Sequence, residues 1–395
     1  MSLDKCERLY RFRNPARIER QADSIGDPIA RLKYLRQATA AAEPVRRRWG
    51  PFGSFCMVAI LLSMRSDAQF RHPSNVRQTD RPLAAESLRV APQEIPNVWR
   101  IAETKDFEVY SNGLRVEDEL AVANEPRLYR LLSVGAGRND GRLTDDKGRS
   151  SVLLRSQPAG IVFHTTESDQ APFEAAEQHN LQRIGRETLL YVRSKRAYHF
   201  VIDRFGRVHR IVVESDAANH AGNSVWADSR WLYLELNQSF LGVSFEASMQ
   251  TDQPPINEAQ THAARVLTEM LRCKYHIAAE NCVTHAQVSV NPDNMRIGWH
   301  CDWGKGFPFA EIGLPENYEL PVPSLYLLGF ESDPAYIHAT GPGLWKGLAV
   351  AEERLREAAG ARRMGVAAYR TLLQKRYRDE IAALKDKSVD EENRQ

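Results

Sequence analysis

The segment Gly160–Ser168 constrains the fold more than any other part of the sequence. Its first four residues, Gly160–Phe163, are apolar and rich in β-branched side chains, and His164 then opens a polar run. A short apolar run that is bounded in this way is typical of a buried strand. We therefore expect a strand whose end places the imidazole of His164 at the edge of a sheet.

Two later segments carry side chains that can meet His164. The first, Cys282–His285, is a short β-rich run that ends on a second histidine, and the other, His300–Phe309, contains Asp302. Zinc in catalytic sites takes three nitrogen, sulfur or carboxylate ligands and leaves one position for water. Two histidines at strand ends and one carboxylate suit such a site. No compact ligand spacing joins these residues, so ordinary core or surface roles remain open at this point.

The region between these segments reads as alternating strands and helices. Two β-rich runs within 197–212 flank a turn and predict a hairpin. Apolar residues recur at helical spacing within Asn257–His276, and Phe173–Leu190 has a helical pattern. The alternation in Leu232–Leu236 predicts a strand with Glu235 on one face.

The composition is that of an ordinary globular protein. The chain has 395 residues, of which 43% are apolar and 26% charged, so two or three folding units fit within it. The net charge of +2 gives no argument for a nucleic-acid partner. Five dispersed cysteines form no CxxC pair. Cys273 and Cys282 can pair in an oxidising compartment or remain two free thiols.

Residues 51–64 form an uncharged apolar stretch behind a basic N-terminal segment, residues 1–50. The stretch is shorter than the roughly 20 residues of a membrane-spanning helix. Three arginines, Arg46–Arg48, precede it, and this arrangement favours export or anchoring of the chain that follows. We therefore interpret 51–66 as a signal or anchor segment. A buried helix in a cytoplasmic protein is the alternative.

The remaining boundaries follow from changes in pattern. Residues 67–97 are polar and contain prolines, which is typical of a linker. Residues 98–154 hold strand-like pieces, among them Phe107–Tyr110, and form a preface to the main domain at 155–318. Residues 319–395 are a largely helical C-terminal extension.

Residues 159–310 resemble the zinc-dependent N-acetylmuramoyl-L-alanine amidases, which share a fold with peptidoglycan recognition proteins. Five pieces stand in the order of that family: the strand ending at His164, the hairpin Tyr198–Gly206, the loop His220–Gly222, the strand Leu234–Leu236, and His285 followed by Asp302–Phe309. The resemblance implies an α/β fold with a central mixed β-sheet flanked by helices. It covers less than half of the chain, so the N-terminal extension and the C-terminal helical segment lie outside it.

The resemblance implies that His164, His285 and Asp302 bind one Zn²⁺. The 17 positions from His285 to Asp302 exceed the spacing of compact family members, and an insertion at 292–298 accounts for the difference. Cys301 is the alternative third ligand, because some relatives use cysteine there. Asp302 is favoured by the aromatic segment that follows it, although Trp303 replaces the usual proline.

Three further residues receive roles from the resemblance. Glu235 matches the carboxylate that some members use as general base. His300 stands where the family often has a lysine that stabilises the oxyanion. His220 matches a histidine at the lip of the cleft and is expected to bind substrate.

The implied activity is hydrolysis of the amide between the lactyl group of N-acetylmuramic acid and L-alanine of a peptidoglycan stem peptide. Peptidoglycan or a muropeptide is then the partner, and the cell envelope, periplasmic or extracytoplasmic, is the place of work. A non-catalytic peptidoglycan-binding module of the same fold is the alternative. The sequence does not indicate an oligomeric state.

Overall fold

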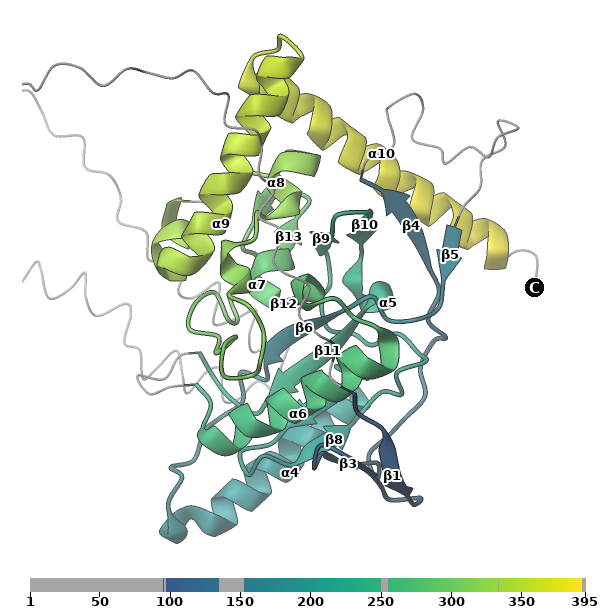
Figure 1. Cartoon of the computed structure of the whole chain (residues 1–395), viewed down its shortest axis with the longest axis vertical. Helices are drawn as coiled ribbons and strands as arrows, with labels where there is room; N and C mark the ends of the chain where they lie inside the picture. Colours follow the sequence, from purple (N-terminus) through teal and green to yellow (C-terminus); the bar gives the residue numbers. More distant parts are fainter. Residues whose placement is uncertain (1–94, 96, 135–152, 250–254, 333, 393–395) are drawn as a thin grey trace, which may run out of the picture. The chain divides into compact units, whose positions relative to one another are not determined.

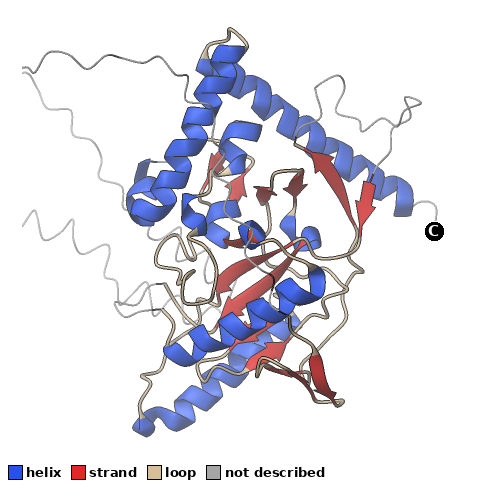
Figure 2. Ribbon diagram, in the orientation of Figure 1, coloured by secondary structure: helices blue, strands red, loops and turns tan. Residues whose placement is uncertain are grey.

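The computed structural model describes residues 95, 97–134, 153–249, 255–332 and 334–392, which form an α/β fold (Figures 1 and 2). Its centre is an eight-stranded mixed sheet in the order β1-β2-β3-β8-β7-β11-β6-β12. These strands are β1 (Arg100–Glu103), β2 (Phe107–Tyr110), β3 (Arg115–Glu117), β8 (Val208–Arg210), β7 (Phe200–Ile202), β11 (Phe240–Phe245), β6 (Gly160–Thr165) and β12 (Cys282–Thr284). The predicted central mixed sheet is confirmed.

Four neighbouring strands of this sheet, β7, β11, β6 and β12, run parallel to one another. The register places Ser244 of β11 beside His164 of β6, and Thr284 of β12 beside Phe163. Every residue of β6 is buried, as expected of a parallel strand that is covered on both faces. Parallel strands end at the same edge of a sheet, so the ends of β6 and β12 meet there.

Helices α4 (Gln178–Ser194) and α6 (Glu258–Tyr275) cover opposite faces of the sheet. Successive residues of a strand point to opposite faces. Val201 of β7 accordingly lies in a hydrophobic cluster with residues of α4, whereas Ile202 lies in the main cluster with residues of α6. The sheet is therefore the middle of three layers in this region.

The ends of α6 follow from its sequence. The Asn257 side chain accepts a hydrogen bond from the backbone of Gln260, and the Gln260 side chain bonds back to the backbone of Asn257. This capping box starts the helix. His276 ends it in the left-handed conformation. The predicted helix Asn257–His276 is confirmed, whereas the helix expected at Phe173–Leu190 begins later, at Gln178.

A buried ionic cluster joins the residues before 118 to the rest of the sheet. The guanidinium of Arg210 on β8, 8% exposed, pairs with Glu108 of β2 at 2.7 Å, with Glu214 at 2.9 Å and with Asp118. Burial raises the pKa of Glu108, but hydrogen bonds from Arg210 and Tyr110 outweigh this effect and lower the pKa to about 2. Residues 100–117 of the segment that we expected to be a preface thus belong to the main sheet.

A second sheet has the order β5-β4-β10-β9. Its strands are β5 (Leu153–Arg155), β4 (Tyr129–Ser133), β10 (Trp231–Leu234) and β9 (Val225–Ala227). The strand that we predicted at Leu232–Leu236 therefore ends at Leu234 and belongs to this smaller sheet. Glu235 follows it with a φ of 57° and precedes the short helix α5 (Leu236–Ser239). The expectation that Glu235 lies on a strand face is wrong.

A two-stranded sheet, β13 (Val290–Asn291) with β14 (Arg296–Ile297), occupies the extra length between His285 and Asp302. This hairpin coincides with the predicted insertion. It follows the short helix α7 (His285–Val288) directly along the chain.

The C-terminal extension is helical, as predicted. It contains α8 (Pro323–Leu328), α9 (Pro334–Ala361) and α10 (Val366–Glu392). Gly341, with a φ of 72°, interrupts the helical backbone within α9. The ring of Tyr377 on α10 packs against Phe330, with their centroids 4.9 Å apart. Helix α10 therefore packs against an earlier part of the same extension.

Several expectations fall on residues that the structure does not describe, including those for 1–50 and 51–66. Among the described residues, no helix has the length and apolar character that a bilayer crossing requires. The described cysteines Cys273, Cys282 and Cys301 are free thiols, so the pairing of Cys273 with Cys282 is not formed.

We expect Arg210→Leu to lower the free energy of unfolding by about 3–5 kcal/mol at neutral pH, because three carboxylates near it lose a buried partner. Urea unfolding measures this change. The difference in unfolding free energy between the wild type and the variant decreases as the pH falls from 4.5 towards 2. In this range Glu108 becomes protonated in the wild type as well, so its ion pair with Arg210 no longer stabilises the fold. Arg115→Leu is the control, since its pair with Glu117 is exposed and no measurable change is expected. Equal losses of unfolding free energy in both variants would contradict a stabilising role for the buried ion pairs of Arg210.

Candidate metal centre

Three ligand-type side chains meet at the edge where β6 and β12 end. The Nδ1 atom of His164 lies 3.2 Å from Oδ2 of Asp302, and Nδ1 of His285 lies 2.9 Å from Oδ1 of the same carboxylate. The two imidazole rings have centroids 4.4 Å apart. One ligand atom from each residue lies within 4.8 Å of the others. The structure thus brings together the three residues that the sequence analysis selected.

Local structure accounts for the position of each histidine. His164 is the fifth residue of β6 and 1% exposed. His285 is the first residue of α7, directly after β12. The Gln287 side chain accepts a hydrogen bond from the backbone nitrogen of Thr284 at 2.9 Å, and this capping box fixes the turn from strand to helix. Parallel neighbours therefore present both imidazoles at one edge.

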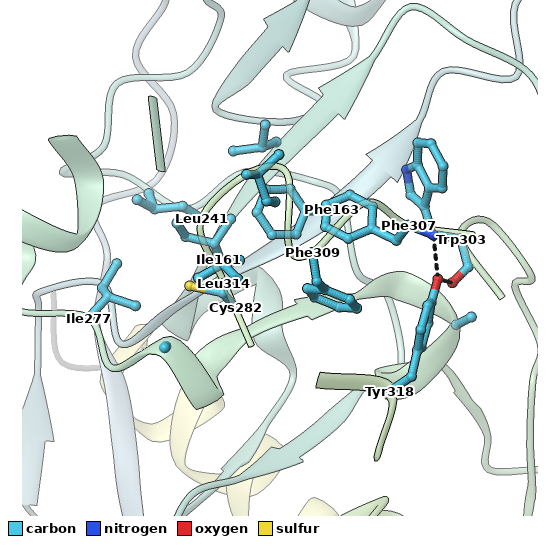
Figure 3. Close-up of a cluster of buried hydrophobic side chains, with 14 of the residues drawn as sticks. Ile161, Phe163, Leu241, Ile277, Cys282, Trp303, Phe307, Phe309, Leu314 and Tyr318 are labelled. Atoms are coloured by element: carbon cyan, nitrogen blue, oxygen red, sulfur yellow. Dashed lines mark hydrogen bonds between the residues drawn. The ribbon is translucent and has the colours of Figure 1, made fainter. Parts of the chain in front are cut away.

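Asp302 is held by a loop with an aromatic anchor. Trp303 is fully buried, and its indole nitrogen donates a hydrogen bond to the backbone carbonyl of His164 at 3.1 Å. The Tyr318 hydroxyl donates to the carbonyl of Trp303 at 2.8 Å (Figure 3). Phe307 packs against Phe163 of β6 with a centroid distance of 4.5 Å. The loop is therefore fastened to the strand that carries the first histidine.

The electrostatics of the cluster favour a neutral imidazole beside an ionised carboxylate. Burial, with a smaller contribution from the neighbouring His285, outweighs the opposite effect of Asp302 and lowers the pKa of His164 to about 4. Burial raises the pKa of Asp302, but the imidazoles of His285 and His164 outweigh this effect and hold that pKa well below its usual range. At neutral pH the cluster can therefore offer a nitrogen lone pair and a negative charge to a cation.

The donor set fits a zinc ion. Ligand distances of about 2.0–2.2 Å in a tetrahedron place neighbouring ligand atoms roughly 3.3 Å apart. The separation of 3.2 Å between His164 Nδ1 and Asp302 Oδ2 agrees with this spacing. Two imidazoles and one carboxylate also form a ligand set typical of catalytic zinc. His164, His285 and Asp302 can thus hold one metal ion.

Cys301 does not take part in the cluster. Its thiol is exposed and lies 3.7 Å from the carbonyl oxygen of Gly298. The candidate metal group in the described part of the chain contains Asp302 instead. The geometry therefore favours Asp302 over Cys301 as the third ligand.

The other three predicted residues have different surroundings. The ring of His300 stacks on His285 with centroids 4.7 Å apart and an interplanar angle of 16°. Glu235 follows a strand of the second sheet and lines a polar pocket with Asn223 and Asn237. No interaction of the Glu235 side chain with the three ligands is found among the described residues, so the geometry does not support it as general base.

The side chain of His220 lies behind His164. Its Nδ1 atom is 3.1 Å from Nε2 of His164, and its own Nε2 atom is 3.2 Å from the carbonyl oxygen of Phe240. Both ring nitrogens therefore have partners within the protein. The predicted hydrogen bond from this ring to substrate is not supported by this arrangement.

Two side chains next to the cluster received no specific role from the sequence. The ring of Tyr198 lies 5.1 Å from that of His164, and burial raises the pKa of its phenol, so the hydroxyl stays protonated. Ser244 is fully buried beside His164 on the adjacent strand. The pairing register alone reveals Ser244, and no local sequence signal indicates it.

The fold and the cluster define an α/β domain with a candidate catalytic metal centre. Residues 154–302 match the profile of the family described as N-acetylmuramoyl-L-alanine amidase. The resemblance of this part of the chain to that family, predicted from the sequence, is confirmed by this match. The matched residues include all three candidate ligands.

Comparison with solved structures gives similarities to amidases. The chain is 21% identical to the N-acetylmuramoyl-L-alanine amidase LysC from Clostridium intestinale, with 40% of this chain and 83% of that one covered and a TM-score of 0.25. The chain is 19% identical to AmpDH3 from Pseudomonas aeruginosa in complex with anhydromuramic pentapeptide. The match covers 45% of this chain and 63% of that one, with a TM-score of 0.30. The chain is 20% identical to the amidase AmiD from E. coli, with 40% of this chain and 57% of that one covered and a TM-score of 0.27. Likeness at this level does not establish an activity. No curated protein matches the chain.

We expect Trp303→Phe to weaken metal binding by about tenfold, because the His164 carbonyl loses the bond that fastens the Asp302 loop to β6. Chelator competition with the metal-free protein measures the affinity. Trp226→Phe is the matched control, since the buried Trp226 donates to Asn281 at 3.2 Å in another hydrophobic cluster. Both changes lower the free energy of unfolding by about 1–2 kcal/mol. A loss of metal affinity in both variants would argue against a specific role for Trp303.

Proposed function

We propose that this protein is a zinc-dependent N-acetylmuramoyl-L-alanine amidase. The observation that carries the proposal is the convergence of His164, His285 and Asp302 within a segment that matches this family. The reaction breaks the C–N bond between the lactyl carbonyl and L-alanine. Water supplies hydroxide to the carbonyl carbon and a proton to the leaving amine.

The donor set supports zinc as the metal. Two imidazole nitrogens and a carboxylate leave a fourth tetrahedral position for water. A zinc ion bound there would lower the pKa of water and polarise the scissile carbonyl. The burial that keeps His164 neutral leaves its ring able to act as a ligand at neutral pH.

Side chains around the three ligands can orient the substrate and stabilise charge. His300, stacked on His285, can donate a hydrogen bond to the oxygen on which charge develops. The Tyr198 ring packs beside His164, and its hydroxyl donates a hydrogen bond to the carbonyl of Thr165 at 3.4 Å, so we assign it no contact with substrate. We assign no catalytic role to Glu235, because it follows the last residue of β10 and no contact of its side chain with the three ligands is found among the described residues.

A non-catalytic peptidoglycan-binding module is the rival proposal. A module that only binds sugar and peptide does not need three ligand atoms at metal-binding separation. The ionised Asp302 carboxylate beside two buried imidazoles therefore favours the enzyme. We further propose the cell envelope as the place of work, since that is where peptidoglycan lies. Membrane attachment through 51–64 remains a prediction.

We expect the purified full chain to bind about one zinc ion and to release stem peptide from peptidoglycan. Asp302→Ala should lose both the metal and the activity, whereas Cys301→Ala, altered at the adjacent exposed thiol, should keep both. Elemental analysis and chromatography of released peptides are the measurements. Losses confined to Cys301→Ala would move the third ligand by one residue. A wild-type chain that neither binds supplied zinc nor releases peptide would favour the binding module.

We expect Glu235→Gln to retain most of the activity. Removal of a general base costs about 10²–10⁴-fold in rate, so a loss below about tenfold excludes that role. Steady-state peptide release gives kcat for both proteins. A loss of a hundredfold or more, with the zinc content unchanged, would restore Glu235 to the catalytic machinery.

A further inference from the structure

His220 is held in a fixed position behind the first metal ligand. The side-chain oxygen of Asn237, at the start of α5, accepts hydrogen bonds from the backbone nitrogens of His220 at 2.9 Å and Ala221 at 2.7 Å. These bonds fix the backbone at the base of the imidazole. The ring then reaches His164 across the face of the central sheet.

The space for this ring exists because position 242 of β11 is a glycine. A Cβ atom built on Gly242 would lie 2.6 Å from Cγ of His220, which is far closer than real contacts of this kind. The His220 ring therefore packs directly on the backbone of β11. Neighbouring strands β6 and β11 hold His164 and Gly242, so the sheet sets the distance between the two imidazoles.

The hydrogen-bond partners of His220 determine which of its nitrogens carries the proton. A carbonyl oxygen only accepts, so Nε2, at 3.2 Å from the carbonyl of Phe240, is the protonated nitrogen. With its proton on Nε2, the neutral ring has its lone pair on Nδ1, which faces His164 at 3.1 Å and is an acceptor.

The acceptor on His220 determines the tautomer of His164 in turn. Nε2 of His164, 3.1 Å from that acceptor, must carry the proton of the neutral ring. Its Nδ1 atom then presents a lone pair towards Oδ2 of Asp302, at 3.2 Å. Two acceptors at this distance repel each other unless a cation lies between them, so this tautomer is the one that suits metal binding.

We propose that His220 is a positioning residue that fixes His164 in the Nε2–H tautomer, with Nδ1 available to the metal. This inference rests on the proposed function only in that it assumes a metal at the cluster. Metal-binding histidines commonly donate their second ring N–H to an acceptor, which sets ring orientation and basicity. Here a second, neutral imidazole is that acceptor, and it is held by the carbonyl of Phe240.

The decisive pair of variants separates this role from simple packing. His220→Phe keeps a ring of similar size over Gly242 but removes the acceptor. The carbonyl of Phe240 keeps a partner in that variant, because Nη1 of Arg127 lies 3.3 Å away. His220→Asn is smaller, and its side-chain oxygen can take the place of Nδ1 as acceptor.

Zinc affinity of the metal-free full chain, measured by chelator competition, is the first readout. We expect His220→Phe to bind zinc about 10–100-fold more weakly than wild type, as for other losses of a support to a ligand. We expect His220→Asn to recover most of that affinity despite its smaller volume. Wild-type affinity in His220→Phe, or equal weakening in both variants, would overturn the proposal.

The tautomer of His164 in the wild-type protein is the second readout and needs no folded variant at position 220. Long-range ¹H–¹⁵N correlation spectra of histidine-labelled, zinc-loaded full chain report it, with His164→Gln used to assign the signals. We expect a proton on Nε2 of His164. A proton on Nδ1 overturns the proposal even if the protein binds zinc and cleaves peptidoglycan. Failure of the amidase activity alone leaves both readouts intact.

Discussion

The structure depends on placing one ionised carboxylate between two imidazoles in a buried site. An isolated buried charge is strongly disfavoured, so Asp302 needs compensating groups close to it. The nitrogen atoms of His164 and His285 lie about 3 Å from its oxygens. Separations of this size tolerate little movement, and the three residues come from distant parts of the chain. Most of the surrounding structure restricts the positions of these three side chains.

The parallel sheet positions the two histidines, and aromatic packing positions the carboxylate. Adjacent strands β6 and β12 end at the same edge, so the two imidazoles are neighbours. Asp302 lies in a loop and depends on Trp303, whose buried indole bonds to the backbone of His164. The Tyr336 hydroxyl, from the C-terminal extension, donates to the carbonyl of Ala286 in α7. The extension therefore helps to hold the metal centre in place.

Local patterns predicted the elements of the central domain well. The buried strand at Gly160–Thr165, the hairpin after Tyr198 and the helix after Asn257 all follow from side-chain periodicity and capping, which act over a few residues. Glu235 shows where such reasoning stops. The alternation around it correctly indicated a strand, but no local signal showed that β10 pairs with β4 and β9 in a second sheet. Its carboxylate was therefore assigned to the wrong surroundings.

The sequence by itself determined the α/β class, the order of the elements and the choice of His164 and His285 as candidate ligands, because these follow from periodicity and from motifs in family order, whereas it left the third ligand open between Asp302 and Cys301. The tertiary structure alone decided which side chains support the ligands. His220 became a partner of His164 only through the close approach of its ring to Gly242, and Ser244 came beside His164 only through strand register. Hydrogen bonds and packing contacts connect residues that are far apart in the chain. Sequence patterns contain no information about the distances between such residues.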